Sequence, residues 1–283
     1  MNICFLMDPL EQVILEKDTT FVLMLAAQQR GHRVFYVAAD GLNLDRGQVI
    51  VDAQAVSPQD DKACPFLRQG RVTLTAGQID AFMIRTDPPF DDQYLTHTWL
   101  LDLLPARCVV MNSPDGIRTV NEKLWAARFT DLVPATLVTR NRQRMQDFIA
   151  REQDVIVKPT DGYGGQGIFR VRADDPNRNV ILETVSRNFR RDIILQAFVP
   201  AADQGDKRIL LLNGEPLGAV LRRHAADDHR NNFFSGGKPF AADVTPREHE
   251  IIARLRPELI RLGLYFVGIR SEEHTSELQS RQS

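Results

Sequence analysis

A glycine-rich loop is the segment whose residue types and spacing most clearly suggest chemistry. Residues 161–167 read Asp-Gly-Tyr-Gly-Gly-Gln-Gly and match the pattern G-x-G-x-x-G. A dinucleotide-binding loop of this pattern opens a helix, whereas residues 168–171 alternate like a strand. The sequence therefore predicts a flap between two strands, whose bare backbone N–H groups can lie over phosphates. A glycine-rich hairpin without a ligand is the alternative.

Lysines accompany this loop. Lys158 stands shortly before it, after an apolar strand, and Lys123 lies in residues 121–129, which we expect to be helical. An ammonium group is well suited to bind phosphate oxygens. Each lysine by itself is typical of a solvated surface, but together with the loop they predict a clamp for a triphosphate.

A second charged group, Asp206-Lys207-Arg208, follows the expected strand that ends at residues 198–200. It places an acid and a guanidinium beside an expected hinge. A guanidinium there is suited to stabilise the charge that develops on a phosphoryl group during its transfer. The sequence has no P-loop pattern, G-x-x-x-x-G-K-[ST], that would offer another phosphate site.

Strand and helix patterns alternate through the first half of the chain. Apolar strands are expected at residues 2–7, 34–38, 79–84 and 108–111. Thr19 or Thr20 can cap a helix that runs to Gln29 and ends at Gly31, and residues 94–104 are amphipathic. Alternation of this kind with nearly continuous apolar strands predicts an α/β fold built on a parallel, doubly wound sheet.

Polar residues follow several of these strands. Asp8-Pro9, residues 85–90 and Asn112-Ser113-Pro114 all come at the carboxyl end of a strand, where such sheets bind ligands. Aspartate, asparagine, serine and proline are also common turn formers, which is the alternative interpretation. Because arginine is no turn former, Arg85, together with Asp87, is a candidate for contact with a ligand.

The second half continues with shorter elements. Strands are expected at residues 155–157, 168–171, 193–198, 209–212, 216–221 and 264–269. Helices are expected at residues 181–188 and 246–262. Asn213-Gly214 favours a type I′ turn, which would make residues 209–221 a hairpin. Residues 225–239 are polar and are expected to form a mobile loop.

Composition excludes several classes of function. The chain has 283 residues, 43% hydrophobic and 25% charged, with a net charge of -2. That charge predicts no general attraction to nucleic acid or to an anionic membrane, and no apolar run is long enough to span a bilayer. Three cysteines without close spacing predict a reducing compartment, so we expect a cytoplasmic protein, with Cys4 and Cys108 as inert core residues.

Several motifs together resemble the prokaryotic glutathione synthetases of the ATP-grasp superfamily. They are Arg85-x-Asp-Pro-Pro-Phe, Asn121-Glu122-Lys123-Leu124, Val157-Lys158-Pro159 with the glycine flap, and Gly205-Asp206-Lys207-Arg208. The flap and Lys158 are shared by many ATP-grasp enzymes, and the first and last motifs are more specific. The resemblance runs from residue 1 to about Gly268.

The resemblance implies a reaction and a set of site residues. ATP would phosphorylate a carboxylate of γ-glutamylcysteine, and glycine would attack the acyl phosphate to give glutathione, ADP and phosphate. By matching position, ATP would be held by Lys123, Lys158, Gly162, Gly164, Gly165, Gln196 and Phe198. Asp206 would contact nucleotide or metal, and Arg208 would face the transferred phosphate. The substrate side would include Arg85, Asp87, Arg222 and Arg230, and the protein would be a homotetramer.

The resemblance also implies domain boundaries. Residues 1–121 would form a doubly wound parallel-sheet domain that binds substrate. Residues 122–200 would be the ATP-grasp lid, an antiparallel subdomain that carries the flap, and residues 201–270 an incomplete second ATP-grasp subdomain. We expect residues 271–283 to be a non-native, disordered tail, because they show no strand pattern and no apolar face.

The sequence departs from the family where the family binds Mg²⁺. The family's final strand continues with aspartate and then glutamate and asparagine, oxygen ligands that suit this cation. Here Arg270 takes the aspartate position, and Leu278 and Ser280 fall where the other two belong. The expected metal ligands are therefore missing after Ile269, and we expect this chain not to catalyse ligation and to leave a sheet edge open.

Two other functions stay open. Another ATP-grasp ligase, such as a ribosomal-protein glutamate ligase or another peptide ligase, would share the flap and differ in the acceptor. A non-catalytic nucleotide-binding module would keep the flap without the metal site. A nicotinamide dehydrogenase is disfavoured because the glycine motif opens a strand, and nucleic-acid binding because no basic stripe is present.

Overall fold

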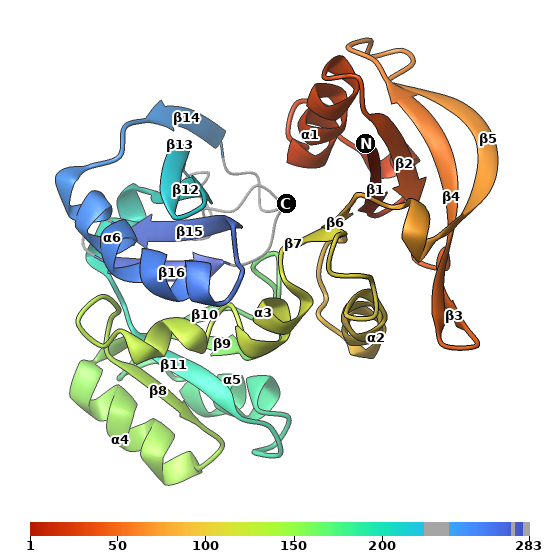
Figure 1. The fold of residues 1–283 in the computed structure, drawn as a ribbon. Coiled ribbons are helices and arrows are strands. Elements are labelled where there is room, and N and C mark those ends of the chain that lie inside the picture. Colours follow the sequence, from red (N-terminus) through yellow and green to blue (C-terminus); the bar gives the residue numbers. More distant parts are fainter. Residues whose placement is uncertain (224–237, 273–274, 280–283) are drawn as a thin grey trace. The chain divides into compact units, whose positions relative to one another are not determined.

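A computed structural model describes residues 1–223, 238–272 and 275–279, with the backbone alone for Gln204, Lys238, Glu272 and residues 275–279. The chain divides into two compact units (Figure 1). Unit 1 comprises Met1–Val120 and Glu258–Val267, and unit 2 comprises Asn121–Pro257 and Gly268–Gln279. No helix in the described part of the chain is long and apolar enough to cross a membrane.

The core of unit 1 is a parallel sheet, as the alternating pattern predicted. Its central strands lie in the order β2-β1-β6-β7 and pair in parallel. They are β1 (Asn2–Leu6), β2 (Arg33–Val37), β6 (Ala81–Ile84) and β7 (Val109–Met111). Cys4 on β1 and the neighbouring Cys108 are buried, and burial is the main cause that raises the pKa of Cys4 to about 12. Both thiols are therefore core groups, as expected.

An antiparallel extension continues this sheet and was not anticipated from the sequence. It consists of β3 (Leu42–Asp45), β4 (Gln48–Pro58) and β5 (Phe66–Thr75). Strand β4 pairs antiparallel with β2, β3 and β5. Arg46 and Gly47 have φ angles of 48° and 78°, the left-handed conformation that a tight two-residue hairpin between β3 and β4 requires.

The helices of unit 1 are α1 (Thr19–Gln29), α2 (Asp92–Leu101) and α3 (Pro114–Thr119). The expected end of α1 is confirmed, and Gly31 follows with a φ of 78°. The cap residue was predicted wrongly: Asp18 caps α1 by accepting from the N–H of Phe21 at 2.9 Å. Aspartate is preferred over threonine at this cap position. The hydroxyl oxygens of Thr19 and Thr20 accept hydrogen bonds from Arg85 instead.

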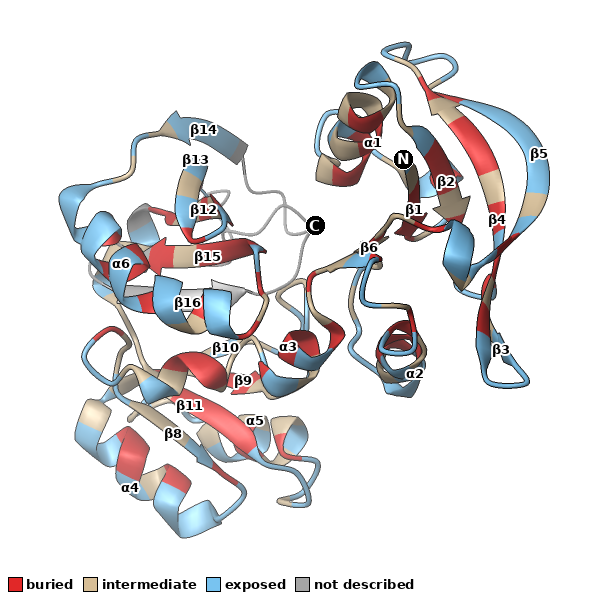
Figure 2. Ribbon diagram, in the orientation of Figure 1, coloured by how far each residue is buried: buried red, intermediate tan, exposed pale blue. Residues whose placement is uncertain are grey.

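The first sheet of unit 2 is antiparallel, with the order β10-β9-β11-β8. Its strands are β8 (Thr136–Thr139), β9 (Asp154–Pro159), β10 (Phe169–Arg172) and β11 (Ile193–Ala197). Helices α4 (Arg142–Glu152) and α5 (Arg178–Val185) pack against it. Met145, Phe148 and Ile149 of α4 follow helical spacing and belong to the apolar core with residues of β9 and β11. Figure 2 shows buried positions along this helix and these strands in red.

Residues 121–129 differ from the expected helix. Only Trp125–Arg128 is helical, as a short 3-10 turn, and Lys123 stands in the turn before it. The side-chain oxygen of Asn121 accepts from the backbone N–H of Lys123 at 3.0 Å and of Leu124 at 3.1 Å. An asparagine that binds nearby backbone groups in this way favours a turn over a regular helix.

The second sheet of unit 2 has the order β14-β13-β12-β15-β16. Its strands are β12 (Asp206–Leu212), β13 (Glu215–Arg223), β14 (Lys238–Ala242), β15 (Phe266–Glu272) and β16 (Thr275–Gln279). The predicted hairpin is confirmed, since Asn213 and Gly214 have φ angles of 53° and 73° between the antiparallel strands β12 and β13. Helix α6 (Pro246–Arg261) is also confirmed within one residue.

The tail contradicts one expectation. Strand β16 pairs antiparallel with β15, and Arg270 stands opposite Glu277. The prediction that residues 271–283 form no strand is therefore wrong for Ser271 and Glu272, which end β15, and for Thr275–Gln279. The edge of β15 that was expected to stay open is covered. A ladder of backbone hydrogen bonds does not require an apolar face, so side-chain periodicity missed this strand.

Candidate active site

The glycine loop joins two antiparallel strands, as the sequence predicted. Val157 on β9 stands opposite Phe169 on β10, and the loop lies between them. Gly164, Gly165 and Gly167 have φ angles of 60°, 79° and 68°, which side chains rarely adopt. These glycines let the backbone curl with its N–H groups unshielded by side chains, the property that a phosphate-covering loop needs.

The start of the loop folds back on the strand that precedes it. A Cβ added at Gly162 would stand 2.6 Å from Cγ of Pro159, so a side chain does not fit there without displacement. Within the loop, the N–H of Gln166 donates to the carbonyl of Tyr163 at 3.1 Å. The loop therefore has a defined turn, which depends on glycine for space as well as for its dihedral angles.

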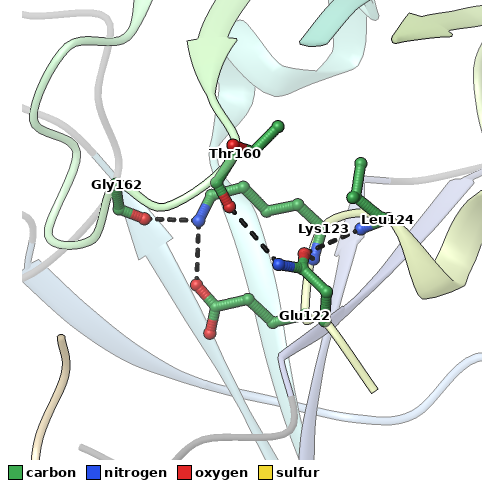
Figure 3. Close-up of polar contacts among 6 residues, drawn as sticks. Glu122, Lys123, Leu124, Thr160 and Gly162 are labelled. Carbon is green, nitrogen blue, oxygen red and sulfur yellow. Dashed lines mark hydrogen bonds and ion pairs between the residues drawn. The ribbon is translucent and has the colours of Figure 1, made fainter. Parts of the chain in front are cut away.

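Lys123 is tied to this loop (Figure 3). Its Nζ donates to the carbonyl oxygen of Gly162 and forms an ion pair with Glu122 at 2.9 Å. The Nδ2 of Asn121 donates to the carbonyl of Thr160 at 3.4 Å, so two neighbouring residues contact the same stretch. The side chain of Lys123 is only 13% exposed, so its charge is held at the loop.

Lys158 is the more deeply buried of the two lysines, with 5% of its surface exposed. Its Nζ donates to Oε1 of Gln196 at 2.9 Å, and Nε2 of Gln196 donates to Oγ1 of Thr136 at 3.0 Å. Strands β9, β11 and β8 thus position one ammonium group through a chain of polar contacts. A buried cation of this kind attracts an anion strongly, because the low local dielectric weakens screening.

Phe198 follows strand β11 and contacts a cation of its own subdomain. The guanidinium of Arg170 lies 3.5 Å from the centre of the Phe198 ring. Arg170 also pairs with Asp154 at 2.8 Å, and this hydrogen bond is the main cause of its raised pKa. One face of the ring is therefore covered by arginine.

Asp206 lies on β12 between two arginines and is 2% exposed. Nε and Nη2 of Arg222, which stands opposite it on β13, donate to its two carboxylate oxygens at 2.7 and 2.9 Å. From β15, Nε of Arg270 lies 2.8 Å from Oδ2 of the same carboxylate. The position where the resemblance implied an aspartate thus holds a cation that is paired with Asp206.

Arg208 and Lys207 point to opposite faces of β12. The guanidinium of Arg208 lies against Gly268 of β15, where an added Cβ would stand 3.1 Å from Nε. Lys207 instead donates to Oε2 of Glu248 and to the carbonyl of Asp243, both at 2.8 Å. Burial by itself would raise the pKa of Glu248, but hydrogen bonds from Lys207 and the N–H of Thr245 lower it overall.

Arg85 and Asp87 belong to unit 1. Arg85 is 5% exposed, and its Nε and Nη2 donate to Oγ1 of Thr20 at 2.8 Å and of Thr19 at 2.6 Å. The N–H of Asp87 donates to Oδ2 of Asp8 at 2.7 Å. The carboxyl ends of the adjacent strands β1 and β6 therefore bring these polar residues together, at the edge where the sequence predicted a ligand.

The remaining predicted residues divide into two groups. Unit 2 gathers the nucleotide candidates around the loop and around Asp206, whereas Arg230 lies outside the described residues. Sequence reasoning missed the groups that hold these side chains, which are Glu122, Thr136, Gly268, Thr19 and Thr20. Glu122 is adjacent to Lys123 in the sequence, whereas the other partners are distant from the side chains that they contact and are shown only by the tertiary structure.

The arrangement in unit 2 suits an anion with several phosphate groups. It combines a glycine turn, two positioned ammonium groups and a strand that presents Arg208. Arginine binds phosphate through two parallel hydrogen bonds, and lysine acts as a compact point charge. Among the described residues, no group of three or more histidine, cysteine, aspartate or glutamate side chains could hold a metal ion.

Family models match nearly the whole chain. The N-terminal domain of prokaryotic glutathione synthetase matches residues 1–118, and its ATP-grasp domain matches residues 122–272. The glutathione synthetase of Rhodopseudomonas palustris is 37% identical over 269 residues, which cover 95% of this chain and 86% of the relative. That of Thermosynechococcus vestitus is 39% identical over 284 residues and covers 95% of this chain and 88% of the relative.

Solved structures share the fold at much lower identity. D-cycloserine synthetase DcsG has a TM-score of 0.66 at 14% identity and covers 98% of this chain and 90% of its own. The ATP-grasp ligase PsnB, solved with a phosphomimetic precursor, Mg and ADP, has a TM-score of 0.60 at 16% identity and covers 99% and 90%. These likenesses show an ATP-grasp fold. Because the two family models account for both halves of the sequence, the chain belongs to the prokaryotic glutathione synthetase family.

Proposed function

We propose that unit 2 binds ATP with its phosphates under the glycine loop. The observation that carries this proposal is the pair of positioned lysines: Lys158 held by Gln196, and Lys123 held at the carbonyl of Gly162. The remaining nucleotide contacts would come from the flap backbone at Gly162, Gly164 and Gly165, and from the segment Gln196–Phe198. Members of this ATP-grasp ligase family use ATP, which fits this geometry.

The reaction is the ATP-dependent joining of a carboxylate and an amine. A carboxylate is a poor electrophile, so transfer of the γ-phosphoryl group to one of its oxygens supplies a leaving group. The amine then attacks the acyl carbon, an amide bond forms, and phosphate departs, leaving ADP as the second product. Arg208 would stabilise charge on the phosphoryl group during transfer. The flap would keep water away from the acyl phosphate, which water would otherwise hydrolyse.

We assign γ-glutamylcysteine as the carboxylate substrate and glycine as the amine, in keeping with the relatives named glutathione synthetase. In unit 1, Arg85 and Asp87 would contact the peptide, since they gather at the carboxyl edge of the sheet. Arg222 and Arg230 were predicted for the substrate side. Asp206 would orient the guanidinium of Arg222 there, since Nε and Nη2 of Arg222 donate to its carboxylate.

The domain division, the assembly and the location are part of this proposal. Residues 1–121 would bind substrate, and residues 122–200 and 201–270 would enclose ATP. The three cysteines are free thiols, which supports a reducing, cytoplasmic location. Exposed apolar side chains such as Trp99 and Val109 support assembly into a homo-oligomer. Light scattering that finds only monomers would contradict the assembly.

Mg²⁺ would accompany ATP in family members that carry acidic ligands at the final strand. The residues present in this chain do not fit that ion at β15. Arg270 brings a positive charge, and both oxygens of Asp206 already accept from guanidinium groups. A hard divalent cation needs several oxygen ligands, and this arrangement does not provide them.

Coupled assay of ADP release tests the function. This chain is compared with a version in which residues from 270 onward carry the acidic segment of the family. We expect no ADP release from this chain, and in the acidic version we expect ADP release that requires both γ-glutamylcysteine and glycine. Lys158→Met should abolish it, whereas Lys62→Met, at a side chain that is 80% exposed, should not.

Two results would count against the proposal. If neither version releases ADP with these substrates, although both are folded and bind ATP, the substrates are wrong and another ATP-grasp acceptor must be sought. If Lys158→Met leaves the rate unchanged, the position of ATP is wrong. Replacing glycine with other amines in the same assay distinguishes glutathione synthesis from the other ligases of this fold.

A further inference from the structure

Three neighbouring strands of unit 2 place their arginines on one face. Side chains two residues apart on a strand share a face, so Asp206 and Arg208 lie together on β12, as do Gly268 and Arg270 on β15. Arg222 stands opposite Asp206 on β13. The contacts agree with this geometry, because Asp206 reaches both Arg222 and Arg270, and Arg208 lies against Gly268. We call these five residues the arginine face.

The arginine face carries an excess of positive charge. The five named residues include three guanidinium groups and one carboxylate, which gives three positive charges minus one negative charge, a net of +2. Lys207 does not contribute, because it points to the opposite face and pairs with Glu248. Asp206 and Arg222 are 2% and 4% exposed and pair with each other, so the charge that this face offers to a ligand comes from the half-buried Arg208 and Arg270.

Gly268 shapes this face for a flat ligand contact. With no side chain at that position, the guanidinium of Arg208 lies directly on the strand, and its Nε, Nη2 and Cζ are 3.1, 3.2 and 3.5 Å from the place of a Cβ. The neighbouring Arg270 is oriented by its Nε contact with Asp206. Planar guanidinium groups held in this way suit oxygens of phosphate, which accept two hydrogen bonds from one arginine.

A divalent cation does not fit the same face. Arginine has no acceptor atom, and its charge repels a metal ion. Both oxygens of Asp206, the carboxylate among these five residues, accept from guanidinium groups. The cationic side chains thus occupy the electrostatic role that a metal ion would have beside a polyphosphate.

We propose that the arginine face binds the polyphosphate of the nucleotide directly, so that nucleotide binding by this chain does not depend on a divalent metal ion. The inference rests on the proposed nucleotide site of unit 2 and adds the way in which its phosphates are neutralised. Direct contact between arginine and phosphate favours free ADP, which carries more negative charge than its Mg²⁺ complex.

The test is equilibrium binding of ADP, measured by calorimetry in EDTA and in Mg²⁺. The unchanged protein should bind ADP in EDTA at least as tightly as in Mg²⁺. Arg270→Asp should weaken binding in EDTA by at least about tenfold and should make it stronger when Mg²⁺ is added. Arg144→Asp, at an exposed position of α4, makes the same change of charge and should alter the affinity by no more than about twofold.

Arg270→Lys is the second variant, because it keeps the charge and changes the shape. It should weaken ADP binding less than Arg270→Asp does and should leave binding insensitive to Mg²⁺. Circular dichroism verifies that each variant is folded. The proposal is overturned if the affinity of the unchanged protein for ADP rises about tenfold or more on addition of Mg²⁺.

Absence of any ADP binding would refute the nucleotide site of the proposed function, and two further measurements then decide this inference. Inorganic pyrophosphate should still bind in EDTA and should be lost in Arg270→Asp. The electron paramagnetic resonance signal of free Mn²⁺ should not fall when the unchanged protein is added. No pyrophosphate binding, or uptake of Mn²⁺ by the unchanged protein, would overturn it.

Discussion

The guanidinium of Arg208 on β12 lies against Gly268 on β15, because these two strands are distant in sequence but neighbours in the sheet. A Cβ at residue 268 would stand 3.1 Å from Nε and 3.2 Å from Nη2 of Arg208. Such distances are tighter than ordinary van der Waals contact, so the arginine would have to move by a few tenths of an ångström. The glycine therefore sets the position of the side chain that we place against the phosphates.

Gly268→Ala is expected to weaken ADP binding in EDTA by about fivefold to tenfold, because part of a charged hydrogen bond is lost when Arg208 shifts. Calorimetry measures the affinity. Gly218→Ala is the matched control, since Gly218 also lies in a strand of this sheet and an added Cβ there meets nothing within 4 Å. Equal affinities for the two variants would show that the contact does not position Arg208.

Asp206→Asn is expected to lower the free energy of unfolding by about 3–5 kcal/mol, because it leaves Arg222 and Arg270 without their shared counter-charge in a buried place. Urea unfolding measures the change. Asp203→Asn removes an exposed carboxylate, 3.5 Å from Arg170, and should cost less than about 1 kcal/mol. If Asp206→Asn proves as mild as its control, Asp206 does not anchor the arginines.

Glu248 should make the free energy of unfolding depend on pH in the acid range. Its pKa in the folded protein is lowered by Lys207 and the N–H of Thr245, against the effect of burial. Stability from a lowered carboxyl pKa is fully present above the ordinary value, about 4.3, and is lost as the pH falls through the folded value. Glu248→Gln should therefore destabilise at neutral pH by about 1–3 kcal/mol, and the difference from the unchanged protein should shrink below about pH 4.

Urea unfolding across a series of pH values measures this effect. Glu250→Gln is the control, because Glu250 pairs with Arg247 at an exposed position, 66% open to solvent. It should change stability by less than about 0.5 kcal/mol at every pH. A difference between Glu248→Gln and the unchanged protein that persists undiminished in acid would contradict the assignment.

Asn112 should stabilise unit 1 through its amide. Its Nδ2 donates to the carbonyl of Phe266 at 2.7 Å, and its Oδ1 accepts from the N–H of Phe266 at 2.8 Å. Asn112→Ala leaves two buried backbone groups unpaired and should cost about 2–5 kcal/mol by urea unfolding. Asn43→Ala, which removes contacts to Gly41 and Asp52 at a half-buried site near the surface, should cost less than about 1 kcal/mol. Similar costs for both would refute this role.

Local patterns in the sequence determined much of the fold. The apolar strands β1, β2, β6 and β7, the hairpin turn Asn213-Gly214 and the long helix α6 were predicted, because their signals lie within a few consecutive residues. The glycine loop was recognised as a flap for the same reason: an alternating segment follows it directly. The backbone dihedral angles that turns require and the periodicity of hydrophobic residues both involve only a few consecutive residues, so they can be recognised in a single sequence.

Long-range pairing accounts for what was missed. The antiparallel strands β4 and β5 and the tail strand β16 are held by partners whose register does not appear in local periodicity. Helix α4 was also overlooked, although its buried residues follow helical spacing, because its sequence is mostly polar and charged. Edge and extension strands gain their stability from backbone ladders that the side-chain pattern describes poorly.

The candidate site shows the same division. The sequence by itself determined which residues carry charge and glycine, among them Lys158, Arg208 and the loop at residues 162–167. Only the tertiary structure decided what each one contacts: Gln196 for Lys158, Gly268 for Arg208, and Asp206 for both Arg222 and Arg270. Charge is a property of the residue, whereas burial and pairing arise when strands distant in sequence meet, and these decide whether a cation repels a metal ion or binds a phosphate.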